Sequence, residues 1–66
     1  MKIKDIRKVI DPLILIWINQ DNFSELYDNI DDVPDVFNES VIDYITTDNL
    51  NYKQTITIEL ESELPF

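Results

Sequence analysis

The sequence contains no histidine, no cysteine and no glycine. Without histidine and cysteine, the chain lacks the commonest general base, the commonest metal ligand and the commonest strong nucleophile of enzymes. Without glycine, it has no glycine-rich loop to hold a phosphate group. The absence of cysteine also excludes disulfides and fits a cytoplasmic protein. These absences predict a protein that is not an enzyme and that uses no cofactor and no metal.

Basic residues are scarce and unevenly placed. The chain has five lysines and arginines against fourteen acids, for a formal net charge of −9. Four of the five basic residues lie in the first ten positions, and the rest of the chain carries Lys53 against thirteen acids. Phosphate groups would meet repulsion over most of such a surface. We therefore expect no direct binding of nucleic acid.

Long apolar runs are also missing, because the longest covers only residues 13–18. A membrane-spanning helix needs roughly 20 apolar residues, so this run predicts no span. The basic start of the chain is interrupted by Asp5 and Asp11 and does not read as a targeting segment. A chain of 66 residues is expected to form a single domain, residues 1–66, with a small core. We expect this domain to be soluble and cytoplasmic.

The apolar run at residues 13–18 predicts a strand, since it is short, rich in β-branched residues and bounded by turn-forming residues. Side chains alternate between the two faces of a strand, so both faces of this one are apolar. One face can be covered by the chain itself, and a second copy in a two-fold dimer can cover the other. We predict that this oligomer interface is formed by Ile14, Ile16 and Ile18.

Residues 1–10 predict a short amphipathic helix, with isoleucines at positions 3, 6 and 10 and charged residues around them. The helix should end near Asp11, because the residue before Pro12 is disfavoured in the α region. Its isoleucines can then pack on the strand at 13–18. In the alternative, Asp11 caps a second helix that begins at Pro12.

The rest of the chain predicts further strands. Alternation is clearest at 52–61, where Ile56, Ile58 and Leu60 share one face, and this segment should form an antiparallel hairpin with residues 41–47. Residues 23–30 favour a strand paired with 13–18, although Ser24 as a helix cap is the alternative. The predicted fold class is α+β, with the N-terminal amphipathic helix packed on a small, mostly antiparallel sheet of three or four strands.

The middle of the chain is acidic. Asp31, Asp32 and Asp35 flank Val33 and Pro34, which suits a single helical turn. The acids lack the ligand spacing of a calcium loop, so a solvated loop is the simpler interpretation. A more specific hypothesis is that carboxylates on a small scaffold imitate the phosphates of a duplex and bind a basic groove of a protein. The predicted contact surface is Asp28, Asp31, Asp32, Asp35, Asp43 and Asp48.

The chain also resembles small phage- and prophage-encoded proteins of AT-rich Firmicutes. The resemblance lies in the helix at residues 1–6, the apolar strand at 13–18, the turn at 32–34 and the final strand at 55–60. Proteins of that kind include inhibitors of host defence nucleases, and many have no assigned role. The resemblance implies an accessory protein that acts in the host cytoplasm and carries no catalytic residue.

Composition and resemblance together predict a non-enzymatic protein that binds a host protein, inhibiting a nucleic-acid-binding or defence protein by DNA mimicry. The alternative is a structural protein that works as a homo-oligomer. A third hypothesis is a miniature enzyme or cation-binding module built on the acids between positions 28 and 39.

Overall fold

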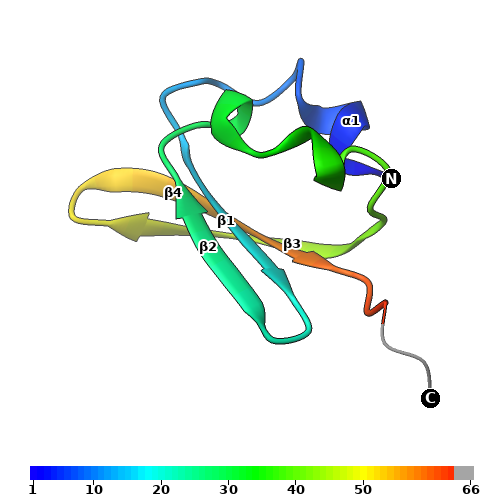
Figure 1. The fold of residues 1–66 in the computed structure, drawn as a ribbon. Helices are drawn as coiled ribbons and strands as arrows, with labels where there is room; N and C mark the ends of the chain where they lie inside the picture. The colour runs from blue at the N-terminus through cyan, green and yellow to red at the C-terminus, as the bar shows by residue number, and fades with distance from the viewer. Residues whose placement is uncertain (64–66) are drawn as a thin grey trace.

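The computed structural model of the chain describes residues 1–63, with the exception of the side chain of Leu50. The four strands form one sheet in the order β2-β1-β4-β3, and the helical elements lie together on one side of it (Figure 1). The predicted α+β class is confirmed. In chain order the elements are α1 (Ile3–Ile6), β1 (Leu15–Gln20), β2 (Phe23–Tyr27), the 3₁₀ turns η1 (Ile30–Asp32) and η2 (Asp35–Phe37), β3 (Ile42–Leu50) and β4 (Lys53–Leu60).

The sheet is mixed, not mostly antiparallel as predicted. β1 pairs antiparallel with β2, and β3 pairs antiparallel with β4, but the central pair β1 and β4 is parallel. The chain leaves β2, crosses the helical side of the sheet and enters β3 at the far edge (Figure 1). β4 then returns between β3 and β1, which places its apolar face beside that of β1. In this arrangement one apolar face of β1 and the apolar face of β4 are buried together beneath the helical elements, which stabilises the parallel pairing.

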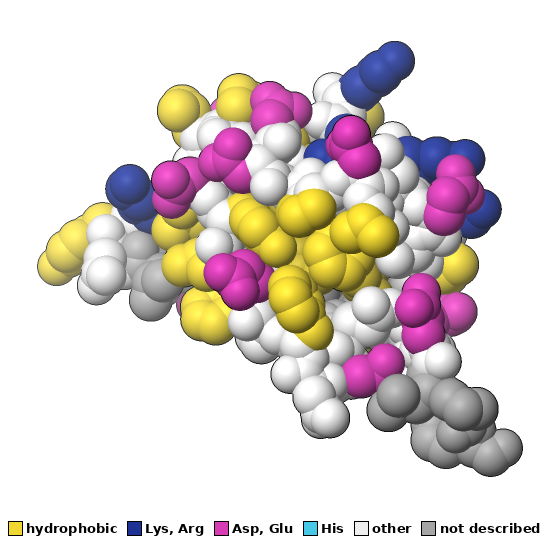
Figure 2. Space-filling view, in the orientation of Figure 1, with side chains coloured by type: hydrophobic (Ala, Val, Ile, Leu, Met, Phe, Trp, Pro, Cys, Tyr) yellow, Lys and Arg dark blue, Asp and Glu magenta, His cyan; other side chains and the backbone are white. Residues whose placement is uncertain are grey.

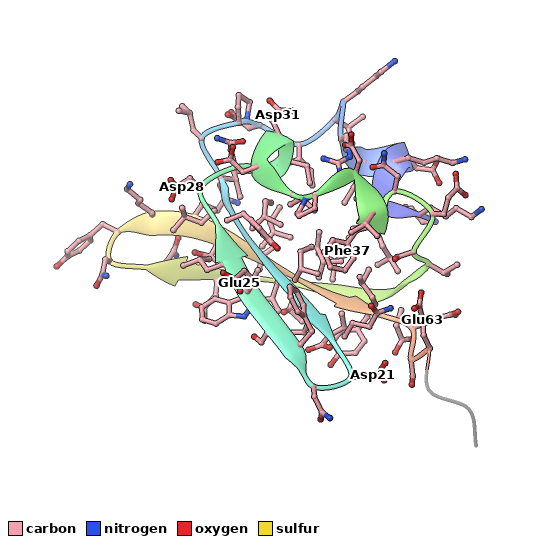
Figure 3. The ribbon with its side chains drawn as sticks, in the orientation of Figure 1. Asp21, Glu25, Asp28, Asp31, Phe37 and Glu63 are labelled. Carbon is pink, nitrogen blue, oxygen red and sulfur yellow. The ribbon has the colours of Figure 1, made fainter. Side chains whose placement is uncertain are left out.

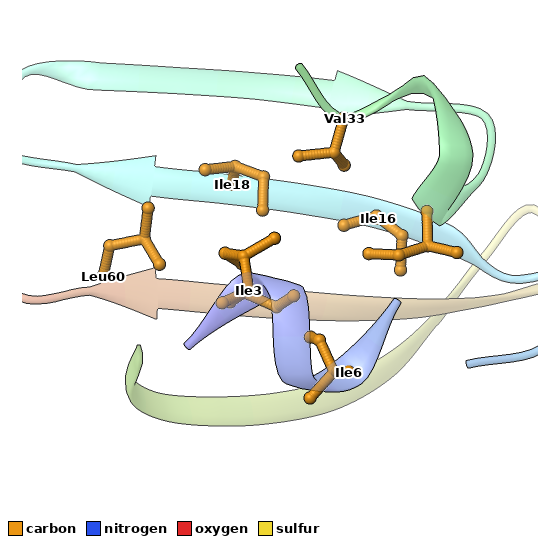
Figure 4. Packing of buried hydrophobic residues seen from close by; sticks show 8 residues of the cluster. Ile3, Ile6, Ile16, Ile18, Val33 and Leu60 are labelled. Atoms are coloured by element: carbon orange, nitrogen blue, oxygen red, sulfur yellow. The ribbon is translucent and has the colours of Figure 1, made fainter. Parts of the chain in front are cut away.

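The core lies between this face of the sheet and the helical elements. Ile16, Ile18 and Ile58 are fully buried there, and Ile3 of α1 packs on them (Figure 4). The prediction that Ile14, Ile16 and Ile18 form an oligomer interface needs correction. Ile16 and Ile18 are inaccessible to a second copy of the folded chain, and Ile14 is half-buried against the same core. The face that the helical elements leave open is the one with Leu15 and Trp17.

The N-terminal helix is shorter than predicted. α1 covers only Ile3–Ile6 and is followed by turns up to a bend at Ile10, so it is a single turn with two buried isoleucines rather than an amphipathic helix over residues 1–10. β-branched Val9 and Ile10 next to Asp11-Pro12 disfavour further helix. Ile10 still packs against the core, as the spacing of the isoleucines predicted.

Both hairpins have tight two-residue turns without glycine. Asp21 has a φ of 51° in the turn between β1 and β2. In the turn between β3 and β4, Asn51 and Tyr52 have φ values of 51° and 68°, and a type I′ turn requires positive φ at both positions. The predicted strand at 23–30 is confirmed for Phe23–Tyr27, and the predicted hairpin of 41–47 with 52–61 is confirmed with a longer β3.

Candidate protein-binding surface

The six aspartates predicted as a contact surface do not form a single row. Four of them, at positions 28, 31, 32 and 35, lie in the segment that crosses the helical side of the sheet, and all four are exposed. Asp43 lies at an irregularity in edge strand β3, and Asp48 lies further along the same strand. The structure therefore brings together four of the six, and it separates Asp43 and Asp48 from them.

The basic N-terminus neutralises only a small part of this acidity. The Nζ atoms of Lys2 and Lys4 lie 2.8 and 2.9 Å from the two carboxylate oxygens of Glu39. Hydrogen bonds from these lysines lower the pKa of the Glu39 carboxyl to about 2. The hydrogen bond to Glu39 in turn raises the pKa of Lys4. These two lysines are thus engaged with one acid that was not among the predicted contact residues.

Arg7 binds the backbone of the segment that carries these four aspartates. Its guanidinium donates to the carbonyl oxygens of Ile30 at 2.9 Å, Val33 at 2.8 Å and Pro34 at 3.1 Å. Its Nε atom donates to Oδ1 of Asn38. The nearest carboxylate, that of Asp35, is 3.8 Å away and almost fully exposed, so this ion pair adds little. The arginine therefore binds the backbone of the segment and leaves its carboxylates exposed to solvent.

The same segment is anchored in the core at two points. Ile30 of η1 and Val33 are almost completely buried, and Oδ1 of Asn29 accepts a hydrogen bond from the backbone N–H of Asp32. Val36 of η2, by contrast, is exposed. The acids are consequently carried on an ordered backbone, as a recognition surface requires.

An aromatic patch lies beside these acids, and we define it as Phe23, Tyr27 and Phe37. The rings of Phe23 and Phe37 are 5.5 Å apart, so edge strand β2 contacts η2 directly. Phe23 is 40% exposed, whereas Tyr27 and Phe37 are half-buried against the core. Figure 2 shows hydrophobic side chains at the centre of this face with acidic side chains around them.

Four exposed acids lie on β2 and on the segment that follows it, and we call Glu25, Asp28, Asp31 and Asp35 the acidic rim. Glu25 lies between Phe23 and Tyr27 on the same face of β2, and it is paired with Ile18 of β1. In Figure 3, Glu25, Asp28 and Asp31 all lie to the left of Phe37. Burial, and secondarily the charge of Glu25, raise the pKa of Tyr27. An apolar centre with a polar rim is the usual anatomy of a protein interface.

The other face of the sheet carries a chain of hydrogen bonds across three strands. The indole N–H of Trp17 donates to Oγ of Ser24, and this hydroxyl donates to Oδ1 of Asn19 at 2.6 Å. The amide of Asn19 donates in turn to Oε1 of Glu59 at 3.0 Å. By the strand register, all four side chains are on the face opposite to the buried Ile16, Ile18 and Ile58. The network fixes the orientation of the Trp17 ring.

A hollow of about 200 Å³ opens on this face next to Trp17, and its other lining residues are Asp48, Asn49, Thr55 and Thr57. Thr55 is only 4% exposed, and its hydroxyl oxygen has no hydrogen-bond partner among the described residues. Buried polar atoms are nearly always paired, so this hydroxyl is an exception that calls for a physical cause. Sequence reasoning missed it, because threonine at a strand position gives no signal of an unpaired hydroxyl.

No group of three or more histidine, cysteine or acidic side chains is placed to hold a metal ion within residues 1–63. No helix in the described part of the chain is long and apolar enough to cross a membrane.

Comparison with known proteins found no relative: no family model matches the chain, and neither a curated protein nor a solved structure matches it.

Proposed function

We propose that this protein is a non-catalytic binding module that occupies the basic surface of a nucleic-acid-binding or defence protein. The observation that carries the proposal is the aromatic patch with its acidic rim, on the side of edge strand β2 that faces η2. The resemblance to phage and prophage proteins suggests a host protein as the partner.

The patch and the rim have different roles in this proposal. Apolar surface such as that of Phe23 gives affinity when it is removed from water. Exposed carboxylates act over longer distances, because they attract a basic partner and speed the encounter. The net charge of −9 adds to this attraction, and it makes the interaction sensitive to salt. DNA mimicry follows if the partner uses the same basic surface for a duplex.

Affinity capture tests the proposal. The immobilised protein is incubated with a lysate of an AT-rich Firmicute and eluted with steps of increasing salt, with and without competing duplex DNA. We expect a basic protein that is released at moderate salt and displaced by DNA. The double variant Asp28→Lys with Asp31→Lys reverses two rim charges. It should lower the affinity for the basic protein about tenfold or more, which corresponds to about 1.4 kcal/mol or more of binding free energy.

A matched control separates the rim from net charge alone. The double variant Asp43→Lys with Glu61→Lys changes the charge by the same amount at exposed acids outside the rim. It should retain the partner almost as well as the unchanged protein. Equal losses in the two double variants, or retention of no protein other than the chain itself, would contradict the proposal. Circular dichroism establishes that each variant is folded.

Homo-oligomerisation is the second candidate function, and the open face of the sheet favours it. Leu26 and Tyr44 are exposed on this face, and Trp17 is half-buried there. One observation opposes this function. Asp48 and Glu59 lie on the same face, and repulsion between these carboxylates and those of a symmetric copy would disfavour a dimer. Light scattering over a range of concentrations measures the solution mass. A stable dimer that Tyr44→Lys dissociates would favour this function over the first.

A further inference from the structure

We infer that the hollow on the open face of the sheet is a binding site for an arginine side chain of a partner protein. This inference goes beyond the proposed function and is independent of the aromatic patch, because the hollow lies on the opposite face of the sheet. The observation behind it is the combination of the Trp17 ring, the Asp48 carboxylate and the Thr57 side chain around one small hollow.

The strand register brings these groups together. On β4, Thr55 is paired with Leu15 of β1 and with Asp48 of β3, so the carboxylate and the hydroxyl are direct cross-strand neighbours. Two residues further along, Thr57 is paired with Trp17. Residues paired in this way share a face of the sheet. The hollow therefore sits on the two central strands and on β3, where main-chain hydrogen bonds hold its walls.

The charge of the hollow is uncompensated. Oδ1 of Asp48 accepts a hydrogen bond from the backbone N–H of Asn49 at 2.7 Å, which uses one of its acceptor positions. None of the ion pairs in the described part of the chain involves Asp48. A carboxylate beside a half-buried aromatic ring is attractive to a cation, since the face of an indole also carries negative potential.

Arginine fits the donors and acceptors of the hollow better than other cations do. Its planar guanidinium stacks on an aromatic ring, donates two parallel hydrogen bonds to a carboxylate, and has further N–H groups for neutral acceptors. The hollow offers these acceptors in the carboxylate of Asp48 and the hydroxyl of Thr57, whereas the hydroxyl oxygen of Thr55 is buried and inaccessible to solvent. Its volume of about 200 Å³ lies below the 300–1,000 Å³ typical of sites for larger ligands, so it suits a single side chain.

Nuclear magnetic resonance with N-acetyl-arginine methylamide tests the inference on the intact chain. We expect saturable shifts of the Trp17 indole N–H and of the backbone amides of Asp48, Asn49 and Thr55. N-acetyl-lysine methylamide at the same concentrations should bind several-fold more weakly, because an ammonium neither stacks nor forms a bidentate pair. Shifts that do not saturate, or equal binding of the two compounds, would overturn the assignment of the hollow to arginine.

Two matched variants locate the site. Asp48→Asn keeps the oxygen that accepts from the backbone of Asn49 but removes the charge, and it should weaken arginine binding about tenfold or more. Asp43→Asn removes an equal charge at an exposed acid outside both the hollow and the acidic rim, and it should leave binding unchanged. If both variants weaken binding equally, the effect is one of net charge and the inference fails. Capture of a partner through the rim does not enter this titration, so the two proposals fail separately.

Discussion

Replacement of Arg7 should destabilise the protein more than replacement of any other charged residue in the N-terminal segment. The side chain is 17% exposed and donates three hydrogen bonds of 2.8–3.1 Å to carbonyl oxygens of the crossing segment. Two of these carbonyls belong to Ile30 and Val33, whose side chains are buried in the core. Arg7→Ala would leave these acceptors without their donor and loosen the attachment of the segment to the sheet.

The size of the effect follows from the contacts. A hydrogen bond to a charged group contributes about 1.5–3 kcal/mol net. Water can replace some of the lost hydrogen bonds where the segment is exposed, so we expect Arg7→Ala to lower the free energy of unfolding by about 2–4 kcal/mol. A single core of this size rarely supplies more than about 3–5 kcal/mol in total. Much of the Arg7→Ala protein should therefore be unfolded at room temperature.

Because much of the Arg7→Ala protein should be unfolded, a milder variant is measured beside it. Arg7→Lys retains the charge but lacks the fork of donors, so it should recover about half of the loss. Lys8→Ala is the matched control, since Lys8 is exposed, and it should stay within about 0.5 kcal/mol of the unchanged protein. Urea unfolding followed by Trp17 fluorescence and circular dichroism measures the midpoints. Free energies for Arg7→Ala and Arg7→Lys within about 0.5 kcal/mol of the unchanged protein would refute the reasoning.

Three further predictions concern pH, turn geometry and the unpaired hydroxyl. The folded state lowers the pKa of Glu39 from an ordinary 4.5 to about 2, so its contribution to stability is full above pH 4.5 and disappears as the pH falls toward 2. The Tm difference between the unchanged protein and Glu39→Gln should shrink over this range, and a constant difference would contradict the prediction. Tyr52→Gly should stabilise the protein by about 1 kcal/mol in urea unfolding, because Tyr52 is fully exposed at a φ of 68°. Tyr52→Ala, which keeps the Cβ atom, should not, and equal gains in the two variants would exclude backbone strain as the cause. Thr55→Val should raise the unfolding free energy by about 1 kcal/mol, since it removes a buried hydroxyl without a partner among the described residues, and a loss would mean that the hydroxyl is paired in solution.

The strands were predictable because their signals are local. Alternation at Ile56, Ile58 and Leu60 gave one buried face of β4, and those side chains are indeed on the core side. The apolar run at residues 13–18 likewise predicted a strand, and the structure has β1 two residues later, at Leu15–Gln20. A period of two residues in the sequence is a direct record of which side chains share a face.

The candidate site was predictable only in part. The acids of the segment from Asp28 to Asp35 were expected at a contact surface, and all of them are exposed in the structure. The neighbouring aromatic patch was not expected, because Phe23 and Phe37 meet only when β2 and η2 pack together. Asp48 was grouped with the acids of the middle segment, although the strand order places it beside Thr55 on the open face.

The sequence by itself determined the positions of the strands, the α+β class and the excess of acidic charge, because each depends on residue type and on spacing along the chain. Only the tertiary structure decided which face of β1 is covered. Both faces are apolar, and the choice depends on where Ile3, Ile30 and Val33 arrive from distant parts of the chain. The parallel pairing of β1 with β4 was decided in the same way, because a contact between segments about 40 residues apart leaves no local pattern. The stability gained by burying apolar surface depends on how all the segments pack together. It therefore cannot be predicted from the pattern of any one segment.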